Sequence, residues 1–221
     1  APITGIIFAI EVFMIDISMA SLIPIIVSSF VAILTSYYFL GRAFEYTITT
    51  STAFMPSNSL FYVGLGLFVG LMSAYFMYVY FKVDKKTKKI KSPWMRFLIG
   101  ATGLGILIFI FPALYGEGYE AINAALNGDT SILFENELFS SFQNNIWIVL
   151  VMLLVIILLK AFATSFTFAA GGVGGTFAPA LFIGSFSGMF FALLINTLGL
   201  GNLNITNFAL VGMRRRKKNL R

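Results

Sequence analysis

The sequence Gly171-Gly172-Val173-Gly174-Gly175-Thr176-Phe177-Ala178-Pro179 separates two long apolar runs. A glycine inside a helix costs about 1 kcal/mol relative to alanine, so the four glycines here disfavour a continuous helix. The fixed φ of Pro179 suits the first turn of a helix, where its missing N–H is not needed. The stretch therefore predicts that one helix ends and another begins in the middle of a membrane.

An interrupted helix inside a membrane has backbone polar groups that only protein or a water-filled cavity can receive. We expect the amides of Gly175, Thr176 and Phe177 to point out of the N-terminus of the second helix, whose partial positive charge attracts anions. Dipoles and amides hold a monovalent anion such as chloride and still release it quickly. The alternative is that these glycines only allow close helix packing. We favour the ion site for residues 174–177.

The composition is that of a membrane protein. Of the 221 residues, 58% are hydrophobic and 11% are charged, and the mean hydropathy is +0.90. Soluble domains carry about 25% charged residues. Because a helix needs about 20 apolar residues to cross a bilayer, we expect an all-α, multi-pass membrane protein. Its predicted spans are residues 22–40, 60–81, 95–111, 146–168 and 177–198, preceded by a partial helix at 3–15.

The distribution of charge predicts an orientation. Residues 82–91 hold six lysines, and short loops rich in lysine stay in the cytoplasm, so we expect residues 82–94 to be cytoplasmic. The acidic region 114–145 is then outside, with short helices at 121–126 and 132–142. The net charge of +6 lies in residues 214–221. We take these as a basic tail without function, separate from a membrane domain of residues 1–213.

Three further residues suggest roles within the bundle. Gly184 and Gly188 have the spacing of a GxxxG motif, and we expect them to pack closely against another helix. Lys160 is the only charged residue in its span. We expect it to face protein or water rather than lipid, either as a partner of carbonyl groups or carboxylates or as an attractant for anions.

Three motifs resemble those of the CLC family of chloride channels and chloride/proton antiporters. Residues 174–184 resemble its GGxFAPxLxxG signature, residues 1–11 resemble its APxxGxxFxxE helix, and residues 112–119 resemble a proline- and glycine-containing element of prokaryotic members. The resemblance implies a CLC-type bundle of tilted and broken helices, the central portion of an inverted-repeat fold. The family's gating-glutamate segment, serine loop and pore tyrosine have no counterpart here, so we expect a partial chain.

The resemblance also implies roles for individual residues. In the family, backbone amides at the positions of Thr176 and Phe177 coordinate the central chloride, next to Gly174 and Gly175. Family members are homodimers with one pore per subunit. The antiporters carry a proton-transfer glutamate directly after the position of Glu11, where this chain has Val12. Glu11 and Val12 are therefore ion-pathway candidates, and both a channel and an antiporter remain open.

We accordingly expect anion transport without covalent chemistry. The chain has no cysteine and no histidine, which excludes thiol nucleophiles, imidazole bases and most zinc sites, so no enzyme, metal or cofactor is expected. The expected partners are chloride, membrane lipid and a second copy of the chain, and no nucleic acid. The alternatives are a fluoride or nitrate carrier on the same scaffold, or a non-transporting membrane scaffold.

Overall fold

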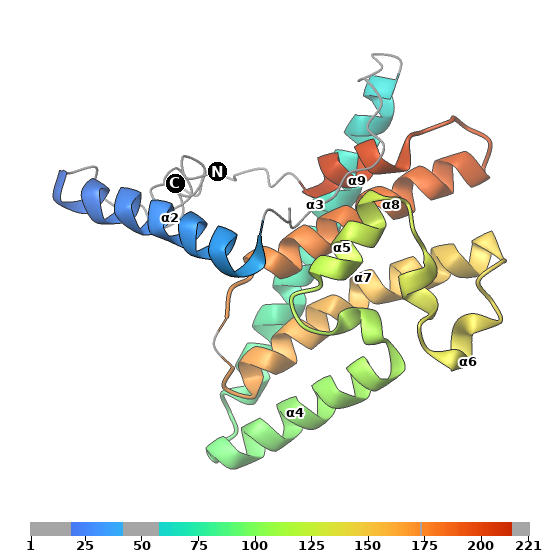
Figure 1. Ribbon diagram of the computed structural model, residues 1–221. Coiled ribbons are helices and arrows are strands. Elements are labelled where there is room, and N and C mark those ends of the chain that lie inside the picture. Colours follow the sequence, from blue (N-terminus) through green and yellow to red (C-terminus); the bar gives the residue numbers. More distant parts are fainter. Residues whose placement is uncertain (1–18, 42–57, 173, 214–221) are drawn as a thin grey trace. The chain divides into compact units, whose positions relative to one another are not determined.

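The described residues are helices joined by short connections (Figure 1). The computed structural model describes residues 19–41, 58–172 and 174–213. They belong to two units, Ala1–Glu45 and Tyr46–Arg221, and each is considered by itself. In the first unit, α2 (Met19–Leu40) has exposed apolar side chains along most of its length, as expected of a helix that meets lipid or other protein.

The second unit contains four long helices. They are α3 (Ser59–Thr87), α4 (Pro93–Ile110), α7 (Ile146–Ala169) and α8 (Phe177–Thr197). Between and after them lie η2 (Pro112–Leu114), α5 (Tyr119–Leu126), η3 (Ser131–Phe134), α6 (Glu137–Ser140) and α9 (Ile205–Met213).

The predicted spans are confirmed. Five helices, namely α2, α3, α4, α7 and α8, are long and apolar enough to cross a membrane. The two short helices predicted between residues 121 and 142 also correspond to observed elements, α5 and the pair η3 and α6. Within residues 19–41, 58–172 and 174–213 no strand occurs, as the all-α prediction requires.

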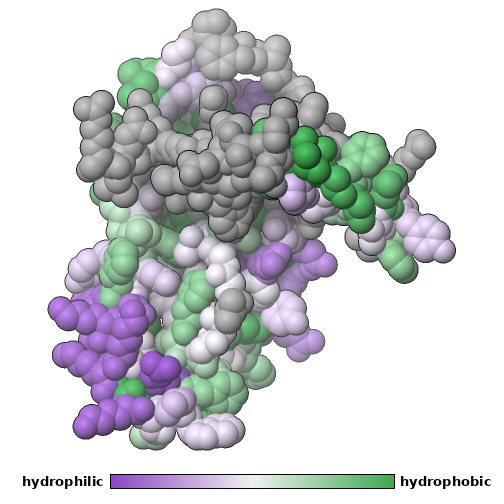
Figure 2. Space-filling model, turned by 90° about the vertical axis from the view of Figure 1, so that its left-hand side faces the viewer, coloured by the Kyte–Doolittle hydropathy of each residue, from purple (hydrophilic) through white to green (hydrophobic). Residues whose placement is uncertain are grey.

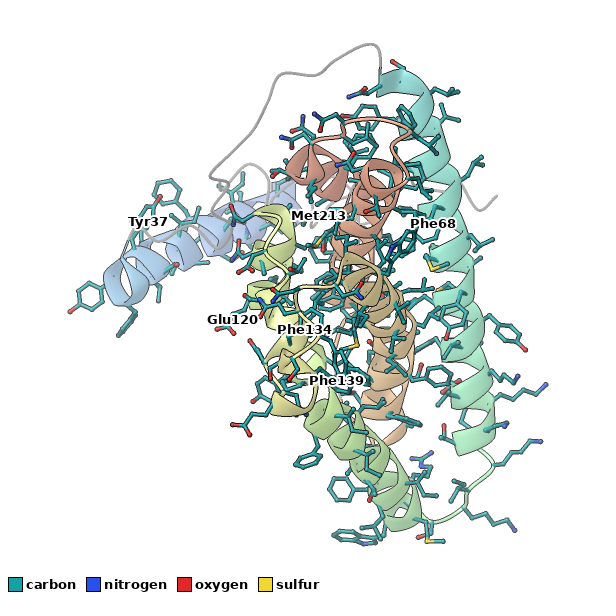
Figure 3. All side chains as sticks on the ribbon, turned by 90° about the vertical axis from the view of Figure 1, so that its right-hand side faces the viewer. Tyr37, Phe68, Glu120, Phe134, Phe139 and Met213 are labelled. Carbon is teal, nitrogen blue, oxygen red and sulfur yellow. The ribbon has the colours of Figure 1, made fainter. Side chains whose placement is uncertain are left out.

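The core of the second unit is built around α7 and α8. About half of the most apolar window of each is buried in protein (50% and 56%), whereas only 6% of the corresponding window of α4 is buried. From α3, Phe68 points into the bundle, where its ring stacks on Phe190 of α8 with centroids 5.4 Å apart (Figure 3). The helices at the periphery therefore present their apolar side chains outward, as a lipid-facing surface does.

Glycines allow the backbones of α8 and α9 to meet. A Cβ atom on Gly188 would collide with the carbonyl oxygen of Phe208, and one on Gly184 would collide with the carbonyl oxygen of Gly212. The predicted close packing of Gly184 and Gly188 is thus confirmed, with α9 as the partner helix. Asn196 fixes the turn between the two helices. Its side chain accepts a hydrogen bond from the Leu203 N–H at 2.7 Å and donates one to the Leu203 C=O at 2.9 Å.

The sequence prediction was wrong about where α3 ends. The apolar run stops at Phe81, and a loop was expected from residue 82, but the helix continues to Thr87. Lysine is a good helix former, and the last turns carry an i,i+4 ion pair in which Lys88 lies 2.7 Å from Asp84. Part of the lysine-rich segment is therefore helical.

Several predictions lie outside the described residues. They concern the partial helix at residues 3–15, the ion-pathway candidates Glu11 and Val12, and the tail at residues 214–221.

Candidate functional site

Helix α7 ends in a hydrogen-bonded C-terminal cap. Gly171 has a φ of +93°, in the left-handed region that glycine adopts most readily. Its N–H donates to the carbonyl of Phe168 at 3.0 Å, and the N–H of Gly172 donates to the carbonyl of Thr167 at 2.9 Å. This pair of bonds is the Schellman motif. A Cβ atom on Gly172 would lie 2.8 Å from the same Thr167 oxygen, so both glycines are needed to end the helix.

The start of α8 lies directly beyond this cap. Thr176 is the N-cap, and helical bonding begins with the N–H of Ala180, which donates to the Thr176 carbonyl at 3.1 Å. Pro179 occupies the first turn, as predicted, and has no N–H to satisfy. The predicted break between two helices is therefore confirmed, since α7 ends at Ala169 and α8 begins at Phe177. Its position in the middle of a membrane stays a prediction.

The two glycines that precede this helix N-terminus are not crowded by the described residues. A Cβ atom on Gly174 would meet nothing within 4 Å in the described part of the chain, and one on Gly175 would meet only the Phe177 nitrogen at 3.8 Å. The Thr176 side chain makes no capping hydrogen bond to the described first turn of α8. The positive end of the α8 dipole, which attracts anions, thus follows two glycines whose Cβ positions are not crowded by described atoms.

Lys160 is buried next to the same pair of helices. Only 2% of this α7 residue is exposed, and its Nζ donates to the carbonyls of Leu114 at 3.2 Å and Gly116 at 3.1 Å. The Nζ also lies 4.4 Å from the ring centroid of Phe182 on α8. The expectation that Lys160 faces protein is confirmed, and backbone carbonyls with an aromatic ring are its partners.

No carboxylate of the described residues lies within 4.0 Å of the Lys160 ammonium. Over the described ranges, the one ion pair is that of Lys88 with Asp84 at the end of α3. Phe182 follows Phe177 by five residues, so the Lys160 ammonium faces α8 about 7.5 Å along the helix axis from its first residue. A buried cation and the positive end of a dipole thus act on the same helix.

The structure places the proposed chloride ligands together. Gly174, Gly175, Thr176 and Phe177 form one continuous segment at the N-terminus of α8, while Glu11 and Val12 lie outside the described residues. Among the described residues, no group of histidine, cysteine and carboxylate side chains has the arrangement of a metal site.

Sequence reasoning missed two features of this region. It assigned Gly174 and Gly175 to the ion site but gave Gly171 and Gly172 no separate role, whereas the structure shows that these two residues end α7. It also missed Gly118, where a Cβ atom would lie 2.6 Å from the Phe182 ring. The helix end at Gly171 and Gly172 was detectable, because a glycine directly after a helical apolar run signals a C-terminus. The crowding at Gly118 was not, because it depends on a contact between segments far apart in the chain.

Comparison with known proteins agrees with the family resemblance found in the sequence. The family model described as voltage gated chloride channel matches residues 1–214. The chain is 28% identical over 193 residues to a voltage-gated ClC-type chloride channel ClcB of Citrobacter koseri, covering 86% of this chain and 42% of the relative. It is 26% identical over 215 residues to a putative chloride channel protein ClcB-like of Ralstonia nicotianae, covering 96% of this chain and 46% of the relative.

An archaeal relative is also similar. An uncharacterized protein of Methanocaldococcus jannaschii is 30% identical over 176 residues, covering 79% of this chain and 40% of the relative. The chain thus spans less than half the length of these curated relatives.

Proposed function

Because this chain belongs to the voltage-gated chloride channel family, we propose that it forms part of a pathway for chloride across a membrane. The anion is held at the N-terminus of α8 by the backbone amides of Thr176 and Phe177. Gly174 and Gly175 add no side chains of their own next to these amides. The observation that carries the proposal is the break between α7 and α8, which sets the N-terminus of a long apolar helix directly after a glycine-rich segment.

The chemistry of the site favours a weakly held monovalent anion. The ligands proposed are amide dipoles rather than side-chain cations, and a conducting site must bind its ion weakly enough to release it. Lys160 contributes a positive potential from within the protein, but its N–H groups are directed at the Leu114 and Gly116 carbonyls. We therefore assign direct contact with the anion to the backbone and not to this lysine.

The transport mode and assembly are proposed from family membership. A homodimer with one pore per subunit is what the resemblance to the CLC family implies, and it is proposed on that ground alone. No enzymatic step is required, since moving an ion breaks no covalent bond. Val12 has no titratable group and cannot carry a proton. Chloride uptake into liposomes driven by a pH gradient tests whether transport is coupled to protons, and so distinguishes an antiporter from a channel.

The amide of Phe177 can be tested by replacing it with an ester in the complete protein. Incorporation of phenyllactate at position 177 removes one donor and keeps the side chain, whereas Phe177→Pro would also add a ring next to Thr176, whose ψ is 0°. A hydrogen bond to a charged group contributes about 1.5–3 kcal/mol, so chloride affinity measured by calorimetry should fall about 10- to 100-fold.

The matched control is Phe177→Leu, which changes the side chain and keeps the amide. It should bind chloride within about twofold of the unmodified protein, because both proposed donors remain. Unchanged affinity in the ester variant would remove the site from this amide. Calorimetry with fluoride and nitrate on the same samples distinguishes a carrier of another anion, and absence of any anion flux from the reconstituted protein would favour a non-transporting scaffold.

A further inference from the structure

The C-terminal end of α3 and the following loop form a strongly basic surface. Residues 82–91, called here the basic end of α3, include exposed lysines on the helix and in the loop, namely Lys82, Lys85, Lys86, Lys88, Lys89 and Lys91. Figure 2 shows a compact hydrophilic patch at the lower left of the molecule, and Figure 3 shows nitrogen-tipped side chains gathered at the lower end of α3.

Little negative charge opposes these lysines. Asp84 is the one acidic residue between positions 82 and 96, and its carboxylate lies 2.7 Å from Lys88 Nζ. The N-terminus of α4 follows at once, capped by Ser92, whose side chain accepts from the N–H of Met95 at 3.5 Å. The partial positive charge of that helix end adds to the positive potential of the surface.

The length of α3 places this surface outside the hydrocarbon core. The helix has 29 residues, which corresponds to about 43 Å at 1.5 Å per residue. The hydrocarbon core of a bilayer is about 30 Å thick. The helix is therefore about 13 Å longer than the hydrocarbon core is thick, which is enough for its lysine-bearing end to reach the depth of the lipid headgroups.

Aromatic side chains mark the same depth. Tyr78 and Phe81 on α3 and Trp94 on α4 are 62%, 58% and 76% exposed, and exposed aromatic residues are enriched at the boundary between membrane and water. Lys82 bends back toward this boundary, since its Nζ donates to the Tyr78 hydroxyl at 3.0 Å. The surface thus combines an aromatic anchor with a layer of cations immediately beyond it.

We propose that the basic end of α3, together with Trp94, is a binding surface for anionic phospholipids, whose phosphate groups contact the lysines while their acyl chains lie along the exposed apolar sides of α3 and α4. Phospholipid is favoured over a soluble acidic partner because the aromatic residues hold the lysines at headgroup depth. The inference does not depend on the proposed chloride site, which lies at the start of another helix.

Tryptophan fluorescence tests this surface directly. Trp94 lies beside the lysines. Trp147 is at the opposite end of the helix bundle, because a Cβ atom on Gly100, near the start of α4, would lie 2.8 Å from Ala170 at the end of α7. The complete protein would be prepared with Trp94, or in parallel Trp147, as its single tryptophan. Each form would be reconstituted in vesicles of phosphatidylglycerol and phosphatidylcholine, with either lipid brominated on its acyl chains as the quencher.

The expected result is a selective association at Trp94. Brominated phosphatidylglycerol should show an association constant about fivefold or more above that of brominated phosphatidylcholine, because each lysine near the surface strengthens binding to anionic lipid. The preference should weaken at high salt, and Trp147 should show a smaller one. Neutralising four lysines that take no part in the Tyr78 and Asp84 contacts, by Lys85→Gln, Lys86→Gln, Lys89→Gln and Lys91→Gln, should abolish the preference at Trp94. Arginine at the same four positions should keep it.

Three results would overturn the proposal. They are equal quenching of Trp94 by the two lipids, a preference that survives the four glutamine substitutions, and an equal preference at Trp147. A solvated face or a soluble acidic partner would each give the first of these results. Chloride affinity measured on the same glutamine variant should be unchanged, so failure of this inference is distinguishable from failure of the proposed chloride site.

Discussion

The ammonium nitrogen of Lys160 lies 4.4 Å from the centroid of the Phe182 ring, and this contact joins α7 to α8 in the interior of the bundle. The same nitrogen donates to the carbonyls of Leu114, the last residue of η2, and of Gly116 just beyond it. One buried cation therefore connects three segments of the chain. The arrangement holds α8, whose N-terminus is the proposed chloride site, against the rest of the bundle.

Replacing Lys160 by methionine should destabilise the protein. The apolar side chain fills a similar volume but leaves the buried Leu114 carbonyl without its present donor, and a buried unsatisfied group costs about 1–3 kcal/mol. Thermal unfolding in detergent measures the loss. The exposed Lys89 provides the control, since Lys89→Met should change the free energy of unfolding by less than about 0.5 kcal/mol. Equal stabilities of the two variants would mean that the buried contacts contribute nothing.

Gly118 should tolerate alanine less well than Gly116. Both glycines have positive φ, +83° and +56°, so alanine carries a backbone penalty of about 1–2 kcal/mol at either position. A Cβ atom on Gly118 would also lie 2.6 Å from the Phe182 ring, whereas one on Gly116 would meet no described atom within 4 Å. Chemical unfolding should therefore show a loss for Gly118→Ala that is larger by about 1–3 kcal/mol, the usual cost of overpacking. Similar losses for the two variants would contradict the crowding seen at Phe182.

Gly188→Ala should separate α8 from α9. Its new methyl group would collide with the Phe208 carbonyl, so the two helices must move apart at a cost of about 1–3 kcal/mol or more. Gly66 on α3 is the matched control, because a Cβ atom there meets nothing within 4 Å in the described chain. Gly66→Ala should be neutral or stabilising by up to about 1 kcal/mol, as alanine is the better helix former. Thermal unfolding of both variants in the same detergent checks the contrast.

Gly171→Ala should weaken the end of α7, whereas Gly174→Ala should leave stability unchanged. Gly171 has a φ of +93°, a conformation that costs alanine about 1–2 kcal/mol. Gly174 has neither a positive φ nor a described atom within 4 Å of its Cβ position. A Gly174→Ala variant as unstable as Gly171→Ala, measured by chemical unfolding, would show that the segment before α8 is more crowded than the structure indicates.

Single cysteines test the predicted orientation of the membrane spans. The chain contains no cysteine, and Lys86 and Gln143 are both exposed. They lie on opposite sides of the α4 span, so Lys86→Cys and Gln143→Cys should be labelled from opposite faces of the membrane. In intact cells a membrane-impermeant maleimide should label only the cysteine at position 143, while permeabilised cells should show labelling of both. Labelling at position 86 in intact cells would reverse the predicted orientation.

The sequence alone was sufficient for the elements that depend on local composition. The five spans follow from the length of their apolar runs, and the break before α8 follows from glycines that no helix accommodates well. The position of Pro179 in the first turn of α8 follows from its fixed φ. The end of α3 was missed because a lysine run is compatible with either a loop or the final turns of a helix. The ion pair of Lys88 with Asp84 in the last turns is a contact between side chains.

Local chemistry thus determined which segments are long and apolar enough to cross a membrane and where one helix ends and the next begins. The tertiary structure decided what these segments meet: α9 as the partner of Gly184 and Gly188, the Leu114 and Gly116 carbonyls as partners of Lys160, and Phe182 as the neighbour of Gly118. The physical reason is range. Hydrophobicity and backbone strain act within a few residues, whereas a buried hydrogen bond or a close glycine contact depends on how segments far apart in the chain pack together.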